Sequence, residues 1–163
     1  MALYSIGDYV VYGLNGACQI VQIGTLDFAG PDKIYYSLKP VSDSRSTIFV
    51  PVLKENEELR NVISQSEAED VISKAVNAKP ATYSPVRENC DPVMKSGDSV
   101  AVSQLIKMLH ALRKENRKVH KGLNIQEEKI LKDAERVFYS EIATAFSISM
   151  EEAIIKTENI FAD

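Results

Sequence analysis

The period of the hydrophobic residues changes once along this chain, near residue 66, and no other feature constrains its fold as strongly. Before that point, apolar residues alternate with polar ones, which is the period of a half-buried strand. Beyond it, apolar residues recur three or four positions apart, which is the period of an amphipathic helix. The change predicts an α+β chain in which a small, strongly bent Tudor-like sheet or barrel precedes an all-helical bundle.

The first part predicts four short strands. They cover residues 9–12, 17–23, 34–39 and 47–52, with Ile34, Tyr36, Leu38, Ile48, Val50 and Val52 facing inward. Asn15-Gly16 and Gly30-Pro31-Asp32 are expected turns, because these residue types favour tight turns. Pro51 lacks an amide proton, so the last strand is expected at an edge or to end there.

The second part predicts helices with recognisable first residues. Capping boxes are expected at Ser66 to Glu69, Asn124 to Glu127 and Ser149 to Glu152. A further helix is expected over 99–121, ended by Gly122, and a short one after Ser84-Pro85. These boundaries divide the chain into a β domain over 1–66, a helix and linker over 67–98, and a helical domain over 99–163.

Composition excludes several classes of protein. There are 19 Lys and Arg against 23 Asp and Glu, a net charge of −4, which excludes a wholesale binder of polyanions. The chain has no apolar run of about 18 residues and no basic, apolar leader, so we expect no membrane contact and no secretory signal. Two cysteines without C-x-x-C spacing suit a reducing compartment, so the expected location is the cytoplasm.

Catalytic chemistry is not indicated. Nucleotide-binding and nucleophile-elbow motifs are absent from the sequence. Cys18 lies in an expected strand, where a buried structural thiol is the usual reading. His110 and His120 are ten residues apart, which does not suit a metal pair on adjacent helical turns. We therefore expect no enzyme, no cofactor, no metal site and no small-molecule substrate.

The helix over 99–121 concentrates positive charge. Within 104–121 there are six basic residues against Glu115 alone, a local charge of 6 − 1 = +5. They are Lys107, Arg113, Lys114, Arg117, Lys118 and Lys121. Residues three or four apart share a helix face, so this stripe suits contact with phosphates. The alternative is a solvated helix face with no ligand.

The order of several short segments resembles the CarD/CdnL family of bacterial transcription regulators. In the β part these segments are Ile6–Tyr12 (IGDYVVY), Asn15-Gly16-Ala17, Tyr35–Leu38 (YYSL), Val50-Pro51-Val52 and Leu59–Ile63 (LRNVI). In the helical part they are Ser96-Gly97-Asp98, Gly122-Leu123, Glu127–Leu131 (EEKIL) and Ala134-Glu135-Arg136. Each segment is common by itself, whereas the ordered series over nearly the whole chain is specific.

The resemblance implies that the β domain docks on the β subunit of bacterial RNA polymerase. It also implies that the helical domain meets promoter DNA near the upstream edge of the transcription bubble and stabilises the open complex. The expected polymerase-binding residues are Leu26, Ile48, Phe49 and Pro51. Phe49 points away from the inward residues of its strand, so it is an expected docking anchor. The alternative is a contact between Phe49 and the helix at 66–77.

Many members of this family place a Trp before the helical domain, where it wedges into the minor groove. This chain has no Trp, and Tyr83 stands at the matching position as the expected wedge or as a packed linker residue. Weak, sequence-tolerant DNA binding is expected, because the basic stripe contains no Asn or Gln to read bases. The alternative function is a protein–protein adaptor on polymerase that does not contact DNA.

Overall fold

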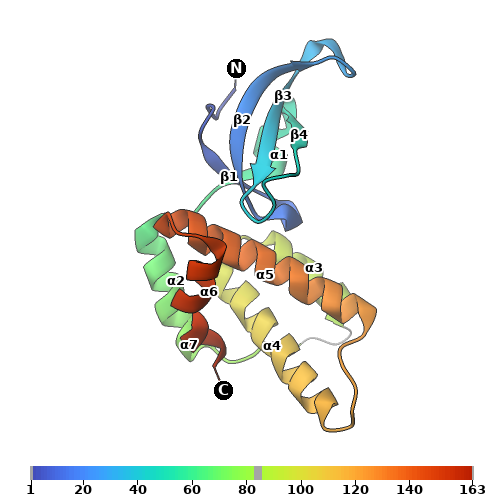
Figure 1. The fold of residues 1–163 in the computed structure, drawn as a ribbon, viewed down its shortest axis with the longest axis vertical. Helices are drawn as coiled ribbons and strands as arrows, with labels where there is room; N and C mark the ends of the chain where they lie inside the picture. The colour runs from blue at the N-terminus through green and yellow to red at the C-terminus, as the bar shows by residue number, and fades with distance from the viewer. Residues whose placement is uncertain (1, 83–85, 163) are drawn as a thin grey trace.

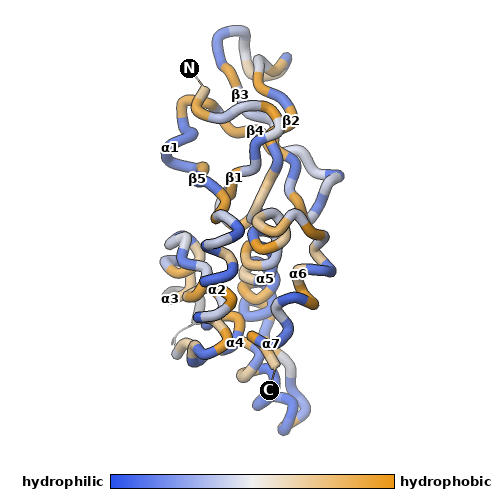
Figure 2. Tube along the Cα trace, turned by 90° about the vertical axis from the view of Figure 1, so that its left-hand side faces the viewer, coloured by the Kyte–Doolittle hydropathy of each residue, from blue (hydrophilic) through white to orange (hydrophobic). Residues whose placement is uncertain are grey.

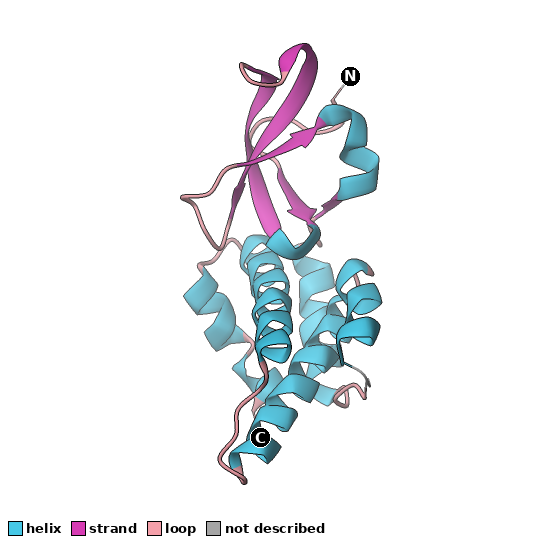
Figure 3. Ribbon diagram, turned by 90° about the vertical axis from the view of Figure 1, so that its right-hand side faces the viewer, coloured by secondary structure: helices cyan, strands magenta, loops and turns pink. Residues whose placement is uncertain are grey.

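The computed structural model describes the backbone of residues 2–82 and 86–162, and the side chains of this part except those of 86–89. A twisted sheet forms one end of the molecule and the helices form the other (Figures 1 and 3). The long helix α5, Ile125–Phe146, runs directly beneath the sheet and contacts it (Figure 1). The predicted α+β fold, with a Tudor-like sheet before a helical bundle, is confirmed.

The sheet has five antiparallel strands in the order β4-β3-β2-β1-β5. The strands are β1 Tyr9–Tyr12, β2 Ala17–Leu26, β3 Gly30–Pro40, β4 Ile48–Pro51 and β5 Leu59–Asn61. Register shifts at two places in the β2–β3 pairing bend these two long strands. Because β4 has a strand neighbour on one side only, the predicted edge position of Pro51 is confirmed. β5 was not predicted, since three residues are too few to show an alternation.

The turns differ from the prediction. β1 and β2 are joined by a 3₁₀ helix, Gly13–Asn15, and only Gly16 of the expected pair takes a positive φ, of 73°. Gly30-Pro31-Asp32 is not a turn, so that prediction was wrong. The chain turns over 27–29, and Gly30, with a φ of 92°, already opens β3 opposite Leu26.

The inward face of the sheet is built largely as predicted. Its buried residues are Val10, Cys18, Ile20, Tyr36, Leu38, Val50 and Leu59. Ile34 was predicted to face inward, but 51% of it is exposed. Ile34 precedes Tyr35, the first residue of β3 that pairs with β4, so β4 does not run beside Ile34.

In the described part of the chain, one α-helix lies between β4 and β5 and six follow β5. They are α1 Glu55–Glu58, α2 Gln65–Asn77, α3 Val86–Lys95, α4 Ser99–Arg117, α5 Ile125–Phe146, α6 Met150–Lys156 and α7 Glu158–Phe161. The capping boxes of α5 at Asn124 and of α6 at Ser149 are confirmed. The box predicted at Ser66 was wrong, because Ser64 has the extended backbone of a cap and accepts from the Glu67 amide at 3.1 Å.

Two helix ends also lie elsewhere than predicted. α4 ends at Arg117, and the Asn116 side-chain amide donates to the Gly122 carbonyl at 2.9 Å across the following turn. The last helix is divided at Thr157, whose hydroxyl donates to the Ala153 carbonyl at 2.8 Å. Ile154 of α6 is 45% exposed.

The helical core surrounds α5, which runs between α2 and α3 on one side and α6 on the other (Figure 2). Its buried residues include Val102, Leu105, Ile106, Leu109, Leu131, Ala134, Val137, Phe138, Tyr139, Ile142 and Ile160. Over the described residues, no helix is both long and apolar enough to cross a lipid bilayer.

Candidate interaction surfaces

The edge strand β4 carries an exposed aromatic pair. Phe49 is 39% exposed and its ring meets the ring of Phe28 edge-on, with the centroids 5.7 Å apart. Phe28 belongs to the β2–β3 turn and is 77% exposed. Phe28 was not predicted from the sequence, because a single Phe in a turn has no pattern. Two aromatic rings held against each other and open to solvent are typical of a docking anchor.

The other residues predicted for this surface are spread over both faces of the edge. Pro51 follows Phe49 by two positions, so it shares its face, and it is half-buried. Ile48 packs partly against the β core, pairs with Leu38 and so belongs to the inner face. Leu26 is half-buried at the end of β2, two residues before Phe28.

A groove continues this surface beyond the end of β4. It encloses about 440 Å³ between the start of β3 and the 3₁₀ helix Val52–Lys54, and Ile34, Tyr35, Pro51 and Leu53 are among the residues that line it. Leu53 is 96% exposed, which is unusual for a leucine in a folded protein. Exposed apolar side chains therefore lie both on β4, at Phe49, and beyond its end, at Leu53.

The basic residues of α4 divide into two groups. Lys107, at the middle of the helix, donates from Nζ to the Ala75 carbonyl at 2.6 Å and to the Ala78 carbonyl at 2.7 Å. These carbonyls lie at the end of α2, where the Ala75 carbonyl also accepts from the Ala78 amide at 3.2 Å. Burial lowers the pKa of Lys107. Lys107 therefore closes the end of α2 and is not available to a phosphate in this arrangement.

The second group lies at the last turns of α4 and just beyond them. We call it the α4 basic end, and it consists of Arg113, Lys114, Arg117, Lys118 and Lys121. Arg113 pairs with Glu128 of α5 at 3.3 Å, and Lys118 pairs with Glu115 at 3.1 Å between two exposed side chains. Arg117 and Lys121 are exposed. The partner of Arg113 comes from a neighbouring helix, so it could not be found by counting charges within α4.

The predicted wedge residue Tyr83 lies outside the described residues.

The two histidines lie near the α4 basic end. His110 is 3.7 Å from Glu135 and meets the Phe161 ring edge-on, so it packs the C-terminal segment against the bundle. Within the described part of the chain, no three His, Cys, Asp or Glu residues are grouped so that they could hold a metal ion.

Burial raises the pKa of two cysteine thiols and one tyrosine hydroxyl in the two cores. Burial raises the pKa of Cys18 to about 12 and, with Asp91 nearby, that of Cys90 to about 11. Both cysteines are free and fully buried. Burial likewise raises the pKa of Tyr139 to about 12. A thiolate is the reactive form of cysteine, so neither thiol is suited to act as a nucleophile.

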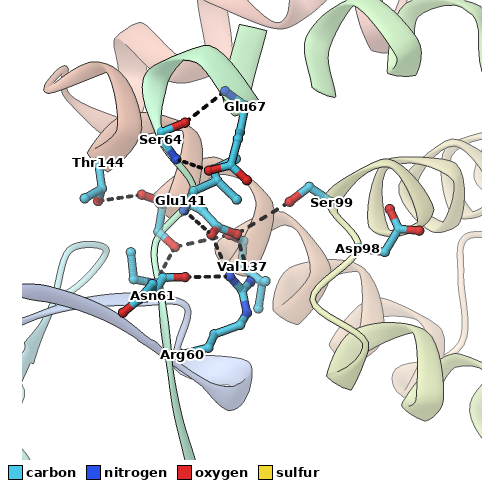
Figure 4. A network of polar contacts seen from close by, with 12 residues as sticks. Arg60, Asn61, Ser64, Glu67, Asp98, Ser99, Val137, Glu141 and Thr144 are labelled. Carbon is cyan, nitrogen blue, oxygen red and sulfur yellow. Dashed lines mark hydrogen bonds and ion pairs between the residues drawn. The ribbon is translucent and has the colours of Figure 1, made fainter. Parts of the chain in front are cut away.

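A polar network joins the sheet to the helices, and its centre is Glu141 of α5 (Figure 4). The Arg60 guanidinium of β5 donates to both carboxylate oxygens, at 2.7 and 2.8 Å. The Ile63 amide and the Ser99 hydroxyl donate to the same carboxylate, at 3.0 and 3.5 Å. In the sequence, Arg60 and Ile63 stand out only as part of a family-like segment, and Glu141 was not predicted as a site residue.

A second contact between the two halves lies at the turn before β2. The Ala17 amide donates to Ser140 Oγ at 2.9 Å, and the Arg136 guanidinium donates to the Leu14 carbonyl at 3.1 Å. A β-carbon on Gly16 would overlap Ser140 Oγ and would lie 3.0 Å from the Arg136 carbonyl oxygen. Only glycine therefore allows the turn to approach α5 this closely.

Two family models match the chain, one on each side of the link between β5 and α2. The family described as CarD-like/TRCF RID domain matches residues 4–63, and the family described as CarD, C-terminal domain matches residues 64–158. The first match covers the whole sheet, and the second covers α2 to α6. The chain therefore belongs to the CarD-like family, whose members are non-enzymatic transcription regulators that interact with RNA polymerase.

Proposed function

We propose that this protein docks on the β subunit of RNA polymerase through the β4 edge and stabilises the promoter open complex through its helical half. The observation that carries the first part is the exposed pair of Phe28 and Phe49 on an edge strand. An edge strand offers unpaired main-chain groups to a partner strand, and the aromatic pair beside it supplies an apolar anchor. We expect one β subunit of RNA polymerase to bind at this edge.

The second part of the proposal assigns the α4 basic end to promoter DNA. Arg117, Lys118 and Lys121 are exposed at one end of the helical half. A few cations of this kind contact phosphates without reading bases, which gives weak and salt-dependent binding. Lys107, which was expected in this site, is removed from the proposal because it donates to the end of α2. Tyr83 stays in the proposal as the residue that meets a distorted base step.

The polymerase contact is tested by capture of the β subunit on the immobilised full-length protein. Phe49→Ala is expected to weaken capture without changing circular dichroism or melting temperature, because the side chain is largely outside the core. Ile155→Ala is the matched control, since Ile155 is an apolar residue of α6 that is 65% exposed. Equal capture by both variants and by the wild type would remove β4 from the interface.

The DNA contact is tested by the lifetime of open complexes on two unrelated promoters. The double variant Arg117→Glu, Lys118→Glu is expected to shorten both lifetimes to a similar extent and to reduce their salt dependence. The control Lys95→Glu, Lys132→Glu changes the net charge equally, at the end of α3 and on α5. If the two double variants have the same effect, net charge and not the α4 basic end is responsible.

A polymerase adaptor without DNA contact is the second candidate, and one observation favours it. Among the six predicted DNA-binding cations, Lys107 and Arg113 bond to neighbouring helices, at the end of α2 and at Glu128. Lys118 also pairs with Glu115 of α4. The positive charge that α4 presents to solvent is therefore smaller than the sequence indicates. An adaptor is expected to retain its effect on polymerase when Arg117 and Lys118 are reversed in charge, so the same lifetime measurement separates the two functions.

A further inference from the structure

The Glu141 carboxylate collects donors from three separate segments of the chain. Only 1% of Glu141 is exposed, and its two oxygens accept from Arg60 at 2.7 and 2.8 Å. The Ile63 amide, in the link between β5 and α2, donates at 3.0 Å. The Ser99 hydroxyl, at the first residue of α4, lies at 3.5 Å (Figure 4). One side chain of α5 therefore joins the sheet, the link and α4.

Arg60 packs closely against a glycine as it reaches this carboxylate. Gly97 precedes the cap of α4 and has a φ of 75°, which favours glycine. A β-carbon there would lie 3.3 Å from Arg60 Nε. The guanidinium is thus where segments 59–63 and 96–98 meet, which the sequence shows only as parts of the family resemblance.

The second contact between the halves restricts their relative orientation further than one contact could. Ser140 and Arg136 of α5 bind the turn before β2, at the Ala17 amide and the Leu14 carbonyl. These residues lie on α5 beside Glu141 or about one helical turn before it. A single bonded point would leave the two halves free to rotate about it in every direction, whereas a second point on the same helix leaves rotation only about the line that joins the two points.

We propose that Arg60 and Glu141 are positioning residues that hold the helical half at one orientation to the sheet. This inference rests on the proposed function: a chain docked through β4 then presents the α4 basic end at a defined place on the promoter. The carboxylate is buried, whereas 35% of the Arg60 side chain is exposed. Replacing an ion pair with a buried member by apolar residues is often neutral or favourable for stability, so stability alone does not account for the pair. Its two parallel bonds instead fix geometry, as bidentate Arg–carboxylate contacts do.

The orientation is measured directly by the distance between two spin labels in the full chain. Labels at Thr25→Cys and Glu151→Cys report on the sheet and on α6, and both positions are exposed. The native Cys18 and Cys90 are fully buried and stay unlabelled in the folded protein. The labelled wild-type chain is expected to give one narrow distance distribution, and Arg60→Ala and Glu141→Gln are expected to broaden it.

Two further variants keep the test independent of folding. Arg60→Lys retains the charge but cannot form two parallel bonds, so a partial broadening is expected. Ile106→Val removes a methylene from the fully buried core of α4 and lowers stability without touching the contact between the halves, so its distribution should match the wild type. An unchanged distribution in both Arg60→Ala and Glu141→Gln would overturn the inference.

Function is measured on the same variants as capture of the β subunit and as open-complex lifetime. Arg60→Ala is expected to keep wild-type capture and to shorten the lifetime about tenfold, within the range of couplings between contacting residues. A broadened distance distribution with an unchanged lifetime would overturn the positioning role. If the wild type fails to capture polymerase, the proposed function fails, and the distance distributions still decide whether the pair fixes the orientation.

Discussion

The backbone of Gly16 lies against the hydroxyl of Ser140 with no room for a β-carbon between them. Gly16→Ala is therefore expected to force the turn away from α5 and to strain a φ of 73°, lowering the free energy of unfolding by about 2 kcal/mol or more. Gly24→Ala is the control, because open space surrounds that glycine and its φ is not positive. Thermal melts of both variants decide this. Equal melting temperatures would show that the turn yields without cost.

Lys107 is expected to matter for stability and not for DNA. Lys107→Ala removes the Nζ donor of both the Ala75 and the Ala78 carbonyl, while the Ala75 carbonyl keeps the Ala78 amide as a donor at 3.2 Å. The change should cost about 1 kcal/mol of unfolding free energy. Lys121→Ala, at an exposed position, should change stability by less than about 0.5 kcal/mol. Denaturant melts measure both. A stable Lys107→Ala variant with weakened DNA binding would return Lys107 to the DNA site.

Phe28 and Phe49 are expected to act as a unit in polymerase binding. Each single change to Ala should weaken capture, and the double change should cost less than the sum, with a coupling of about 0.5–1.5 kcal/mol. The reason is that the two rings are in contact, with their centroids 5.7 Å apart, so the loss of either ring also alters the position of the other. Binding affinities of the four proteins complete the cycle, and strictly additive losses would mean that the rings contact polymerase independently.

Both cysteines are expected to resist thiol reagents until the protein unfolds. Their pKa values, about 12 for Cys18 and about 11 for Cys90, are raised by burial, so both stay protonated in the folded state at pH 8. Unfolded cysteine ionises near pH 8.5, so the unfolded state loses these protons first as pH rises. Their contribution to stability is thus complete below about pH 8 and is lost between about pH 8.5 and pH 12. Rapid labelling of the native protein at pH 8 would contradict this.

The first residue of α2 can be tested with two serines. Ser64→Ala should cost about 1 kcal/mol, because Ser64 Oγ accepts from the Glu67 amide and Glu67 bonds the Ser64 amide in return. Ser66→Ala, one residue inside the helix, should be neutral or slightly stabilising, because alanine is the better helix former. The opposite order of the two melting temperatures would move the cap back to Ser66.

Local patterns in the sequence were enough for the fold class and for several element ends. The alternation around Tyr36 and Leu38 and the caps at Asn124 and Ser149 are local, and the structure confirms them. The errors occur where the deciding contact is distant or the element is short. β5 has three residues, and the choice between Ser64 and Ser66 depended on a backbone conformation that composition does not encode.

The candidate sites were less predictable for a related reason. Counting charges along α4 could not reveal that Lys107 faces the end of α2 or that Arg113 meets Glu128 on α5. The pairing of Arg60 with Glu141 joins residues 81 positions apart. Such contacts depend on how elements pack, and helical or strand periodicity reports only on each element by itself.

The two edges of the sheet are not equivalent, and this limits how copies of the protein can associate. At the β5 edge, the Arg60 side chain bonds the neighbouring Asn61 carbonyl at 3.2 Å as well as Glu141, and the strand leads within a few residues into α2. A strand added at β4 therefore finds no equivalent open edge on the opposite side of the sheet. Growth by repeated edge-to-edge pairing, the route by which sheets form fibres, needs both edges. The sheet can therefore bind one added strand, at β4, without offering a second edge for further strands. This suits a protein that must not self-associate before it binds RNA polymerase.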